Sequence, residues 1–322
     1  MTAADIVAVV ASLPSPSSAA LKICPLTLRA YGLMIALGVV AATWLLGRQL
    51  EQKGEGTADD ASSVAVWGVA AGVIGARLYH VATEWSKFSD DLGAIPKIWE
   101  GGLGIPGGLL LGAAAGAWQA RRRGIPGAVI LGCAAPAIPL AQAIGRLGNW
   151  FNQELFGRPT DLPWALEIDD RHNLGYPLGT TFHPTFLYEL LWNLGLVGVL
   201  LWVDRRFRLG PARLFGVYIA GYGLGRFWIE GLRIDPTNAS DVAGLRWNQW
   251  VALAAIVGGA LYVWWTRGQL WPERADDAAA DDAAVDDAAA DHAAEDDAAA
   301  DHDESSVEAA AEPLAGDGTE SS

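Results

Sequence analysis

The feature that most constrains this chain is a succession of apolar stretches, each close to the twenty or so residues that cross a lipid bilayer as a helix. Seven stretches qualify: 28–47, 63–81, 102–120, 126–145, 184–203, 214–231 and 249–266. The segments between them are too short to cover seven apolar helices in a water-soluble protein. We therefore predict an all-α, polytopic integral membrane protein with about seven transmembrane helices.

The acidic charge of the chain is confined to its carboxyl-terminal end. The formal net charge is −15, yet residues 275–322 hold 17 Asp or Glu and no Lys or Arg, so the remainder is close to neutral. This end repeats a five-residue unit, D-D-A-A-A, that does not match the helical period and forms no apolar face. We predict a disordered, low-complexity acidic tail, with a specific docking tail as the alternative. The near-neutral remainder leaves no basic surface for nucleic acid.

The distribution of basic residues predicts the orientation. The segments after the first, third, fifth and seventh stretches carry 11 of the 22 Lys and Arg residues, whereas the other loops are longer and more acidic. Lys and Arg mark cytoplasmic loops, which places the amino terminus outside and the carboxyl terminus in the cytoplasm. We expect an extracytoplasmic arm over residues 1–27, a transmembrane domain over 28–266 with an outer-face segment at 146–183, and a cytoplasmic tail over 267–322.

The densest polar cluster lies at the outer end of the fourth stretch, in G-R-L-G-N-W-F-N-Q-E-L-F-G at 145–157. Its polar side chains are Arg146, Asn149, Asn152 and Glu154. Polar groups at membrane depth are costly and usually functional. Arg146 could grip a phosphate with two parallel hydrogen bonds, the amides could donate to phosphate or glycerol oxygens, and Glu154 could orient Arg146. The alternative is ordinary interfacial anchoring, helped by Trp150.

A second group lies along the sixth stretch, at offsets that place its members on one helical stripe. These residues are Tyr222, Arg226, Glu230 and Arg233. A polar stripe on an apolar helix has to face a cavity or other helices. Two interpretations stay open: a structural salt bridge between Arg226 and Glu230, or a second cation that faces Arg146.

Other polar residues stand at the ends of the remaining stretches: Arg29, Tyr31, Arg77, Tyr79, His80, His183 and Glu189. For His183 and Glu189, a helix cap and a helix–helix hydrogen-bond partner are as plausible as a functional role. The five His residues are dispersed, so no metal site is indicated, and neither Cys24 nor Cys133 lies beside a plausible base.

Together these segments resemble the prolipoprotein diacylglyceryl transferase family of bacterial integral membrane enzymes. Segment 145–157 is similar to the family's signature, and five further motifs follow the family's order. They are R-A-Y-G-L-M (29–34), G-A-R-L-Y (75–79), W-E-G-G-L (99–103), H-P-T-F-L-Y-E (183–189) and G-R-F-W-I-E-G-L-R (225–233). The resemblance covers about residues 26–265. Its seven spans and outside amino terminus agree with the hydropathy and charge patterns.

The resemblance implies a transferase. Such an enzyme moves the diacylglyceryl group of phosphatidylglycerol to the thiol of the lipobox cysteine in a prolipoprotein, forms a thioether and releases glycerol 1-phosphate. This is the first step of bacterial lipoprotein maturation, at the cell membrane. The implied partners are phosphatidylglycerol, the signal-peptide region of the prolipoprotein and membrane lipid, and no metal or organic cofactor is implied.

The resemblance also implies residue roles. Arg146 would bind the phosphatidylglycerol headgroup, with Asn149, Glu154 and Gly157 in the same site. Arg226 and Glu230 would form a second functional cluster, and Tyr31 and Tyr222 would be functional tyrosines. We add Asn152 and Arg77 as expected contacts of phosphatidylglycerol.

This chemistry suits the residues. A thiol with a pKa of about 8.5 is mostly protonated at neutral pH, so a base or a positive field should assist it. The phosphate departs as an anion, which two fixed arginines would stabilise in a water-poor site. Many family members have a histidine where this chain has Pro106. We predict that Glu230, Tyr222 or His183 assists thiolate formation instead, and the sequence does not choose among them.

Two other classes of membrane protein compete with a transferase. A transporter would also need charges within the membrane, but it predicts paired broken helices in two related halves, and the chain has no such repeat. A structural scaffold would explain the apolar stretches but not the polar stripe.

Overall fold

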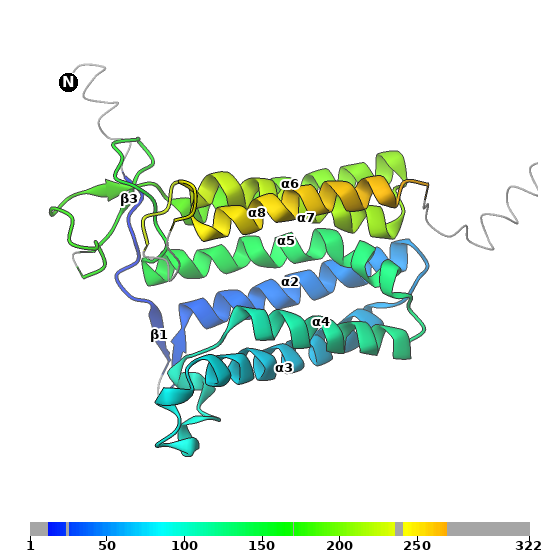
Figure 1. Ribbon diagram of the computed structural model, residues 1–322, viewed down its shortest axis with the longest axis horizontal. Coiled ribbons are helices and arrows are strands. Elements are labelled where there is room, and N and C mark those ends of the chain that lie inside the picture. Colours follow the sequence, from blue (N-terminus) through cyan, green and yellow to red (C-terminus); the bar gives the residue numbers. More distant parts are fainter. Residues whose placement is uncertain (1–11, 24–25, 170, 236–240, 269–322) are drawn as a thin grey trace, which may run out of the picture. The chain divides into compact units, whose positions relative to one another are not determined.

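The computed structural model describes residues 12–23, 26–169, 171–235 and 241–268 (Figure 1). The chain divides into two units, Met1–Trp271 and Pro272–Ser322. The second unit lies outside the described residues, and with it the predicted disorder of the acidic tail. The first unit holds every element that follows.

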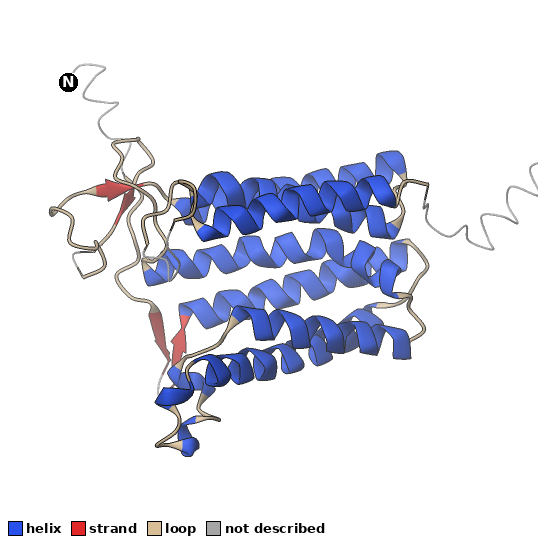
Figure 2. Ribbon diagram, in the orientation of Figure 1, coloured by secondary structure: helices blue, strands red, loops and turns tan. Residues whose placement is uncertain are grey.

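Long helices make up most of this first unit (Figure 2). They are α2 (Ala30–Gln52), α3 (Ala58–Thr83), α4 (Ile105–Arg122), α5 (Gly127–Asn152), α6 (Thr185–Phe207), α7 (Pro211–Glu230) and α8 (Trp247–Trp265). Each coincides with one predicted apolar stretch. Four of them, α2, α3, α5 and α6, are long and apolar enough to cross a membrane. The prediction of a mostly helical protein with apolar membrane-spanning candidates is confirmed at this level.

Two helix boundaries differ from the sequence-based expectation in ways that matter for the polar clusters. Helix α5 continues to Asn152, past the expected end at 145, and ends where Gln153 adopts a left-handed conformation with φ 51°. The start of the signature segment is therefore helical. Helix α4 begins at Ile105 and not at 102, because Gly101 and Gly102 have φ of 102° and 78° and cannot belong to a right-handed helix.

The helices pack as antiparallel neighbours, with α2 against α5, α3 against α4 and α7 against α8. Helix α5 also contacts α6 and α7, so it joins the two sides of the bundle. Small residues allow α3 and α4 to approach closely, as in helix pairs within lipid. On α3 these are Gly68, Gly72 and Gly75, which face Gly107, Gly108 and Gly112 of α4.

Short strands and turns gather at one end of the helices, and the loops α2–α3, α4–α5 and α6–α7 lie at the other (Figure 1). Strand β1 (Ala20–Ile23) pairs antiparallel with β2 (Leu26–Arg29), and β3 (Leu166–Glu167) pairs antiparallel with β4 (Thr181–Phe182). Three 3₁₀ turns, Trp85–Lys87, Leu92–Ala94 and Ile98–Glu100, connect α3 to α4. The all-α expectation is wrong in this detail, because strands of two to four residues are too short to leave a periodic pattern.

The described part of the amino-terminal arm is fixed to the segment between α5 and α6. Leu13 pairs in parallel with Leu166, and its backbone N–H donates to the carbonyl of Ala165 at 2.7 Å. The Trp150 indole N–H donates to the carbonyl of Pro14, and Nε2 of Gln153 donates to that of Pro16, each at 3.1 Å. The arm therefore braces the carboxyl-terminal end of α5.

Candidate active site

A single buried carboxylate joins the two polar clusters that the sequence singled out. Glu189, in the second turn of α6, lies between Arg146 of α5 and Arg226 of α7. Its Oε2 is 2.5 Å from Nε of Arg146, and its Oε1 accepts a hydrogen bond from Nη1 of Arg226 at 3.1 Å. Three helices thus place two guanidinium groups on one carboxylate whose side chain is 7% exposed. The second cation beside Arg146 is Arg226. One of the two interpretations of the polar stripe expected such a cation.

The signature segment forms a chain of hydrogen bonds that leads outward from Arg146. Nη1 of Arg146 donates to Oδ1 of Asn149 at 3.2 Å. Nδ2 of Asn149 donates to Oε1 of Glu154 at 2.9 Å, and Nδ2 of Asn152 donates to the same oxygen at 3.1 Å. Glu154 therefore orients Arg146 through Asn149 and not by direct contact. The end of α5 makes this possible, because the helix places Arg146 and Asn149 one turn apart and the left-handed Gln153 turns Glu154 back towards them.

A second carboxylate, Glu230 at the end of α7, is fully buried and surrounded by cations. Its Oε2 is 2.7 Å from Nη2 of Arg226 and 3.5 Å from Nη1 of Arg233. Its Oε1 is 3.4 Å from Nε of Arg246 and accepts from Nδ2 of Asn248 at 3.0 Å. The Arg226–Glu230 ion pair that the sequence offered as the alternative therefore also forms, and Arg226 bridges both carboxylates.

The arginines around Glu230 differ in how many of their donors are used. Arg246 donates to the backbone carbonyls of Glu230, Arg233 and Asp235 besides its ion pair with Glu230. Arg233 makes two hydrogen bonds to the Asp235 carboxylate. Burial lowers the pKa of Arg233, but its hydrogen bonds to Asp235 and the carboxylates nearby outweigh this effect, so that pKa lies above its usual value. Both guanidiniums are held in place by these contacts.

Arg146 and Arg226 have N–H donors that their contacts with the described residues do not use. Among the described residues, the polar contacts of Arg146 are with Glu189 and Asn149, and those of Arg226 are with Glu189 and Glu230. A guanidinium carries more N–H donors than these contacts use. Their side chains are also 21% and 18% exposed, more than that of Glu189. Both guanidiniums therefore have N–H donors beyond those that bind their structural partners.

The two predicted tyrosines have different neighbours in the structure. Gly148 packs against Tyr31 of α2, so closely that a Cβ on Gly148 would come within 2.6 Å of the Tyr31 ring. Tyr222 of α7 lines a small cavity of about 10 Å³ together with Glu189 and Arg226. The absence of a side chain at Gly148 thus lets α2 bring Tyr31 next to the turn of α5 that carries Arg146 and Asn149.

Gly157 joins three segments through its backbone. Its N–H donates to the carbonyl of His183 at 2.9 Å, and it forms an isolated bridge with Arg233. A Cβ at this position would come within 2.8 Å of the His183 side chain and 3.1 Å of the Leu232 carbonyl. The structure gives Gly157 a packing role, and the expected contact with phosphatidylglycerol stays a prediction.

His183 lies before the first turn of α6, with its Nδ1 3.1 Å from the Tyr188 hydroxyl. That hydroxyl also accepts a hydrogen bond from the Trp164 indole N–H. Partial burial and the positive charge of Arg158 lower the pKa of His183. The imidazole is therefore neutral at neutral pH.

Arg77 is placed in another region, between α3 and the loop that leads to α4. Its guanidinium donates to the carbonyls of Ala94, Ile95, Gly101 and Gly102 at 2.6 to 3.0 Å. It also lies 5.1 Å from the centre of the Phe88 ring. These contacts hold the loop, so the expected role of Arg77 in lipid binding stays a prediction. Pro106 occupies the first turn of α4, where its missing N–H costs nothing.

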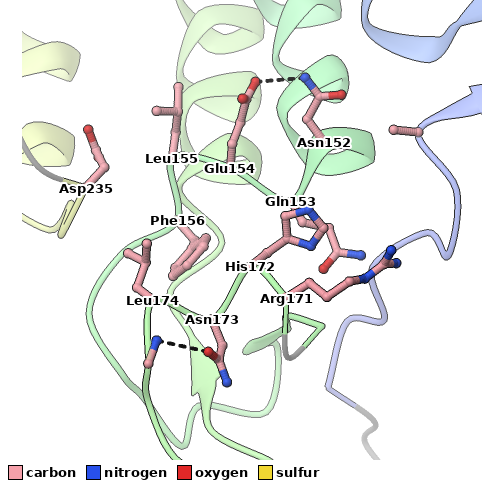
Figure 3. A pocket seen from close by; sticks show the side chains of 12 residues that line it. Asn152, Gln153, Glu154, Leu155, Phe156, Arg171, His172, Asn173, Leu174 and Asp235 are labelled. Atoms are coloured by element: carbon pink, nitrogen blue, oxygen red, sulfur yellow. Dashed lines mark hydrogen bonds between the residues drawn. The ribbon is translucent and has the colours of Figure 1, made fainter.

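A cavity of about 700 Å³ adjoins the outer end of the hydrogen-bond chain (Figure 3). Its lining includes Asn152, Glu154, Arg171, His172, Leu174 and Asp235. Among the described residues, no three His, Cys, Asp or Glu side chains come together as a set of metal ligands.

Sequence reasoning missed several residues of this site. Glu189 was left open between a functional role and a cap or helix–helix partner and was not assigned to the site, although a carboxylate in an apolar helix is itself a signal that a cation faces it. Asp235 and Arg246 were not singled out, because they lie in the polar segment after α7, where charged residues are ordinary. Asn248, in the first turn of α8, was missed as well. The sequence does not show that Arg246 and Asn248 contact Glu230, or that Asp235 pairs with two of the arginines around it.

Comparison with known proteins gives one consistent result. The family model described as prolipoprotein diacylglyceryl transferase matches residues 18–265. A phosphatidylglycerol–prolipoprotein diacylglyceryl transferase of Streptomyces griseus is 47% identical over 257 residues, which cover 79% of this chain and 77% of the relative. Proteins of the same description from Streptomyces coelicolor and Rhodococcus jostii are 48% and 47% identical, each over 79% of this chain and over 73% and 74% of the relative. The matched region contains all seven long helices and both carboxylates.

Proposed function

Because the chain belongs to the prolipoprotein diacylglyceryl transferase family, we propose that it transfers the diacylglyceryl group of phosphatidylglycerol to the lipobox cysteine of prolipoproteins. The observation that carries the proposal for its site is the pair of guanidiniums, Arg146 and Arg226, held on Glu189 by three helices. Such a pair at the outer end of an apolar bundle is suited to a lipid with an anionic headgroup.

The reaction exchanges one bond for another at a glycerol carbon. The sulfur of the cysteine attacks the diacylglycerol carbon that bears the phosphate, and the S–C bond forms as the C–O bond breaks. The phosphate leaves with the electron pair as glycerol 1-phosphate, and the thiol proton passes to a base. Charge therefore accumulates on phosphate oxygens in the transition state, where preorganised donors contribute most.

Arg146 and Arg226 are positioned to bind that phosphate with the donors that Glu189 leaves unused. Glu189 keeps both guanidiniums in place before the lipid arrives, so little reorganisation is needed when the charge develops. Asn149 and Glu154 fix Arg146 from the outer side. Tyr31, against Gly148, and Tyr222, at the Glu189 cavity, complete the surroundings of the pair.

The three predicted bases fit the thiol-activating role unequally. Glu230 fits worst, because three guanidiniums and the Asn248 amide stabilise its charged form and it is fully buried. Tyr222 lies in a suitable position, beside Glu189 and Arg226. His183 is in a suitable protonation state, since its lowered pKa leaves the imidazole neutral and able to accept a proton. Single substitutions at these three positions test the assignment, and wild-type rates in all three variants would rule out a side-chain base.

We extend the proposal to seven membrane spans. Helices α4, α7 and α8 have 18, 20 and 19 residues, and at about 1.5 Å per residue they match the hydrocarbon thickness. They also expose large apolar side chains, among them Leu109, Leu110, Leu224, Val257 and Leu261. The basic loops α2–α3, α4–α5 and α6–α7 share one end, which we assign to the cytoplasm. The site then faces the outer leaflet.

A transfer assay tests the function. Vesicles that contain phosphatidylglycerol and the purified protein are incubated with a lipobox peptide, and mass spectrometry follows the peptide. We expect a gain of one diacylglyceryl group, and no gain with Arg146→Ala, which should insert and melt like a folded protein. No gain with the wild-type chain would reject the function, and full activity of Arg146→Ala would reject the site.

A further inference from the structure

We propose that the 700 Å³ cavity beside Glu154 binds the prolipoprotein segment that directly follows the modified cysteine, as an extended peptide. The inference rests on the proposed function and adds to it a binding site for the protein substrate. It starts from the place of the cavity. Its walls come from the end of α5 and the residues after it, from the segment around Arg171 and Leu174, from Ala19 of the amino-terminal arm and from Asp235 after α7 (Figure 3).

The cavity shares a wall with the arginine site. Asn152 and Glu154 line the cavity, and Oε1 of Glu154 accepts from both Asn152 and Asn149. Asn149 in turn accepts from Arg146. A molecule in the cavity can therefore contact Glu154, and Glu154 binds Asn149, which in turn binds Arg146. The molecule then lies on the outer side of Asn149.

The size and chemistry of the lining exclude two other occupants. A volume of about 700 Å³ lies in the range of pockets that enclose a whole drug-sized ligand, which is far more than a glycerol phosphate fills. The lining mixes the apolar side chains of Leu155, Phe156 and Leu174 with amide, carboxylate, imidazole and guanidinium groups. Acyl chains alone would bury those polar groups without partners, which is costly. An extended peptide, with one donor and one acceptor on nearly every residue, matches such a lining.

The backbone of the cavity is also unusual. Gln153, Leu155 and Leu174 have φ of 51°, 60° and 56°, a left-handed conformation that costs energy for residues other than glycine. All three line the cavity. Strain of this kind concentrates where a ligand is held. Leu174 is 55% exposed in this conformation and adds an apolar contact to those of Leu155 and Phe156.

The direction of the peptide follows from the position of the thiol. The sulfur has to reach the diacylglycerol carbon whose phosphate Arg146 and Arg226 bind, and the apolar segment that precedes the cysteine belongs among the helices and lipid. The residues that follow the cysteine leave on the outer side, where the exposed side chains of Arg171, His172 and Leu174 border the cavity.

Two substitutions on one loop separate this site from its surroundings. Leu174→Glu places a charge in the cavity, whereas Leu178→Glu changes a leucine that is 76% exposed and does not line it. Transfer is measured with two peptides, one that ends at the cysteine and one that continues for several residues. We expect the wild-type chain and Leu178→Glu to have a KM for the longer peptide about tenfold lower, the loss typical of one good contact residue. Leu174→Glu should lose this difference, with an unchanged KM for phosphatidylglycerol.

A second measurement does not depend on catalysis. A photoreactive phenylalanine derivative replaces Leu174 or Leu178, and the probe is a biotinylated lipobox peptide with serine in place of the cysteine. We expect an adduct from position 174 and not from 178, located in the residues after the serine. Equal labelling at both positions, an adduct in the preceding segment, or a changed KM for phosphatidylglycerol in Leu174→Glu would overturn the proposal. Failure of the wild-type chain to transfer lipid would instead reject the proposed function, whatever the labelling pattern.

Discussion

The region around Arg77 and the region around Arg146 each hold an arginine near the carboxyl-terminal end of a long helix, and the two arginines make different contacts. Arg77 gives its donors to four backbone carbonyls, so its partners are neutral groups of one loop. Arg146 shares the Glu189 carboxylate with Arg226 and retains free donors. The first arrangement fixes the shape of a loop. The second keeps two positive charges beside each other and leaves them able to bind an anion.

Replacing each arginine with lysine tests most directly whether the two regions use their arginines differently. Lysine keeps the charge but cannot reproduce the planar fork. We expect Arg146→Lys to lower kcat about 10²- to 10³-fold, the usual cost of one preorganised donor, with little change in thermal stability. Arg77→Lys should lower the melting temperature by several degrees, because buried carbonyls lose their donors. A raised KM for phosphatidylglycerol in Arg77→Lys would instead support the lipid-binding role expected from the sequence.

The two buried carboxylates offer a second contrast. Glu189→Gln keeps the shape of the side chain and removes the shared negative charge, so the two guanidiniums repel each other and lose their alignment. We expect kcat to fall about 10- to 100-fold. Glu230→Gln removes the fully buried carboxylate that three guanidiniums share and leaves them only Glu189 and Asp235 as counter-charges. Breaking a buried ion-pair site in this way destabilises a protein strongly. Its main effect should be a lower melting temperature and a poor yield of folded protein. If both variants lost activity and stability to the same extent, the idea that Glu189 serves mainly catalysis and Glu230 mainly stability would be contradicted.

The packing of Tyr31 can be tested with two neighbouring glycines. Gly148→Ala would push a methyl group into the Tyr31 ring, whereas a Cβ at Gly145 meets nothing within 4 Å. We expect Gly148→Ala to lower the transfer rate about tenfold by shifting α2 against α5. Gly145→Ala serves as the control and should behave like the wild-type chain. Equal rates in the two variants would show that the position of Tyr31 is unimportant.

The smallest expected effect concerns His183. Its pKa is lowered in the folded chain, so the unfolded state binds the proton more readily. The contribution of His183 to stability is therefore complete above the unfolded pKa of about 6.5 and is lost as the pH falls through the folded pKa. Melting temperatures between pH 8 and pH 5 should fall more in the wild-type chain than in His183→Asn. An identical pH dependence of the melting temperature in both proteins would show that the pKa of His183 is not lowered by folding.

The sequence predicts the helices of this fold far better than the contacts of its site. Apolar stretches located all seven long helices, because a helix in lipid needs only length and apolar side chains. The stripe from Tyr222 to Arg233 was also recognisable, since helical spacing alone brings Arg226 onto Glu230. The role of Glu189 was not recognisable from the sequence, because it depends on how α5, α6 and α7 lie against each other.

The loops were the least predictable part. Arg246 and Asn248 reach Glu230 after a segment with no periodic pattern, and strands β3 and β4 have two residues each. The cavity beside Glu154 is built from four separate segments, so no single stretch of sequence carries a signal for it.

The bracing of α5 by the amino-terminal arm has a consequence for how the protein is made. Pro14 accepts a hydrogen bond from Trp150, 136 residues later in the chain, and Ser12 donates to Glu167, 155 residues later. The arm leaves the ribosome first, yet its partners are synthesised only after three helices have been completed. Contacts of such long range form late. The arm can therefore brace α5 only when the beginning of the chain meets its middle.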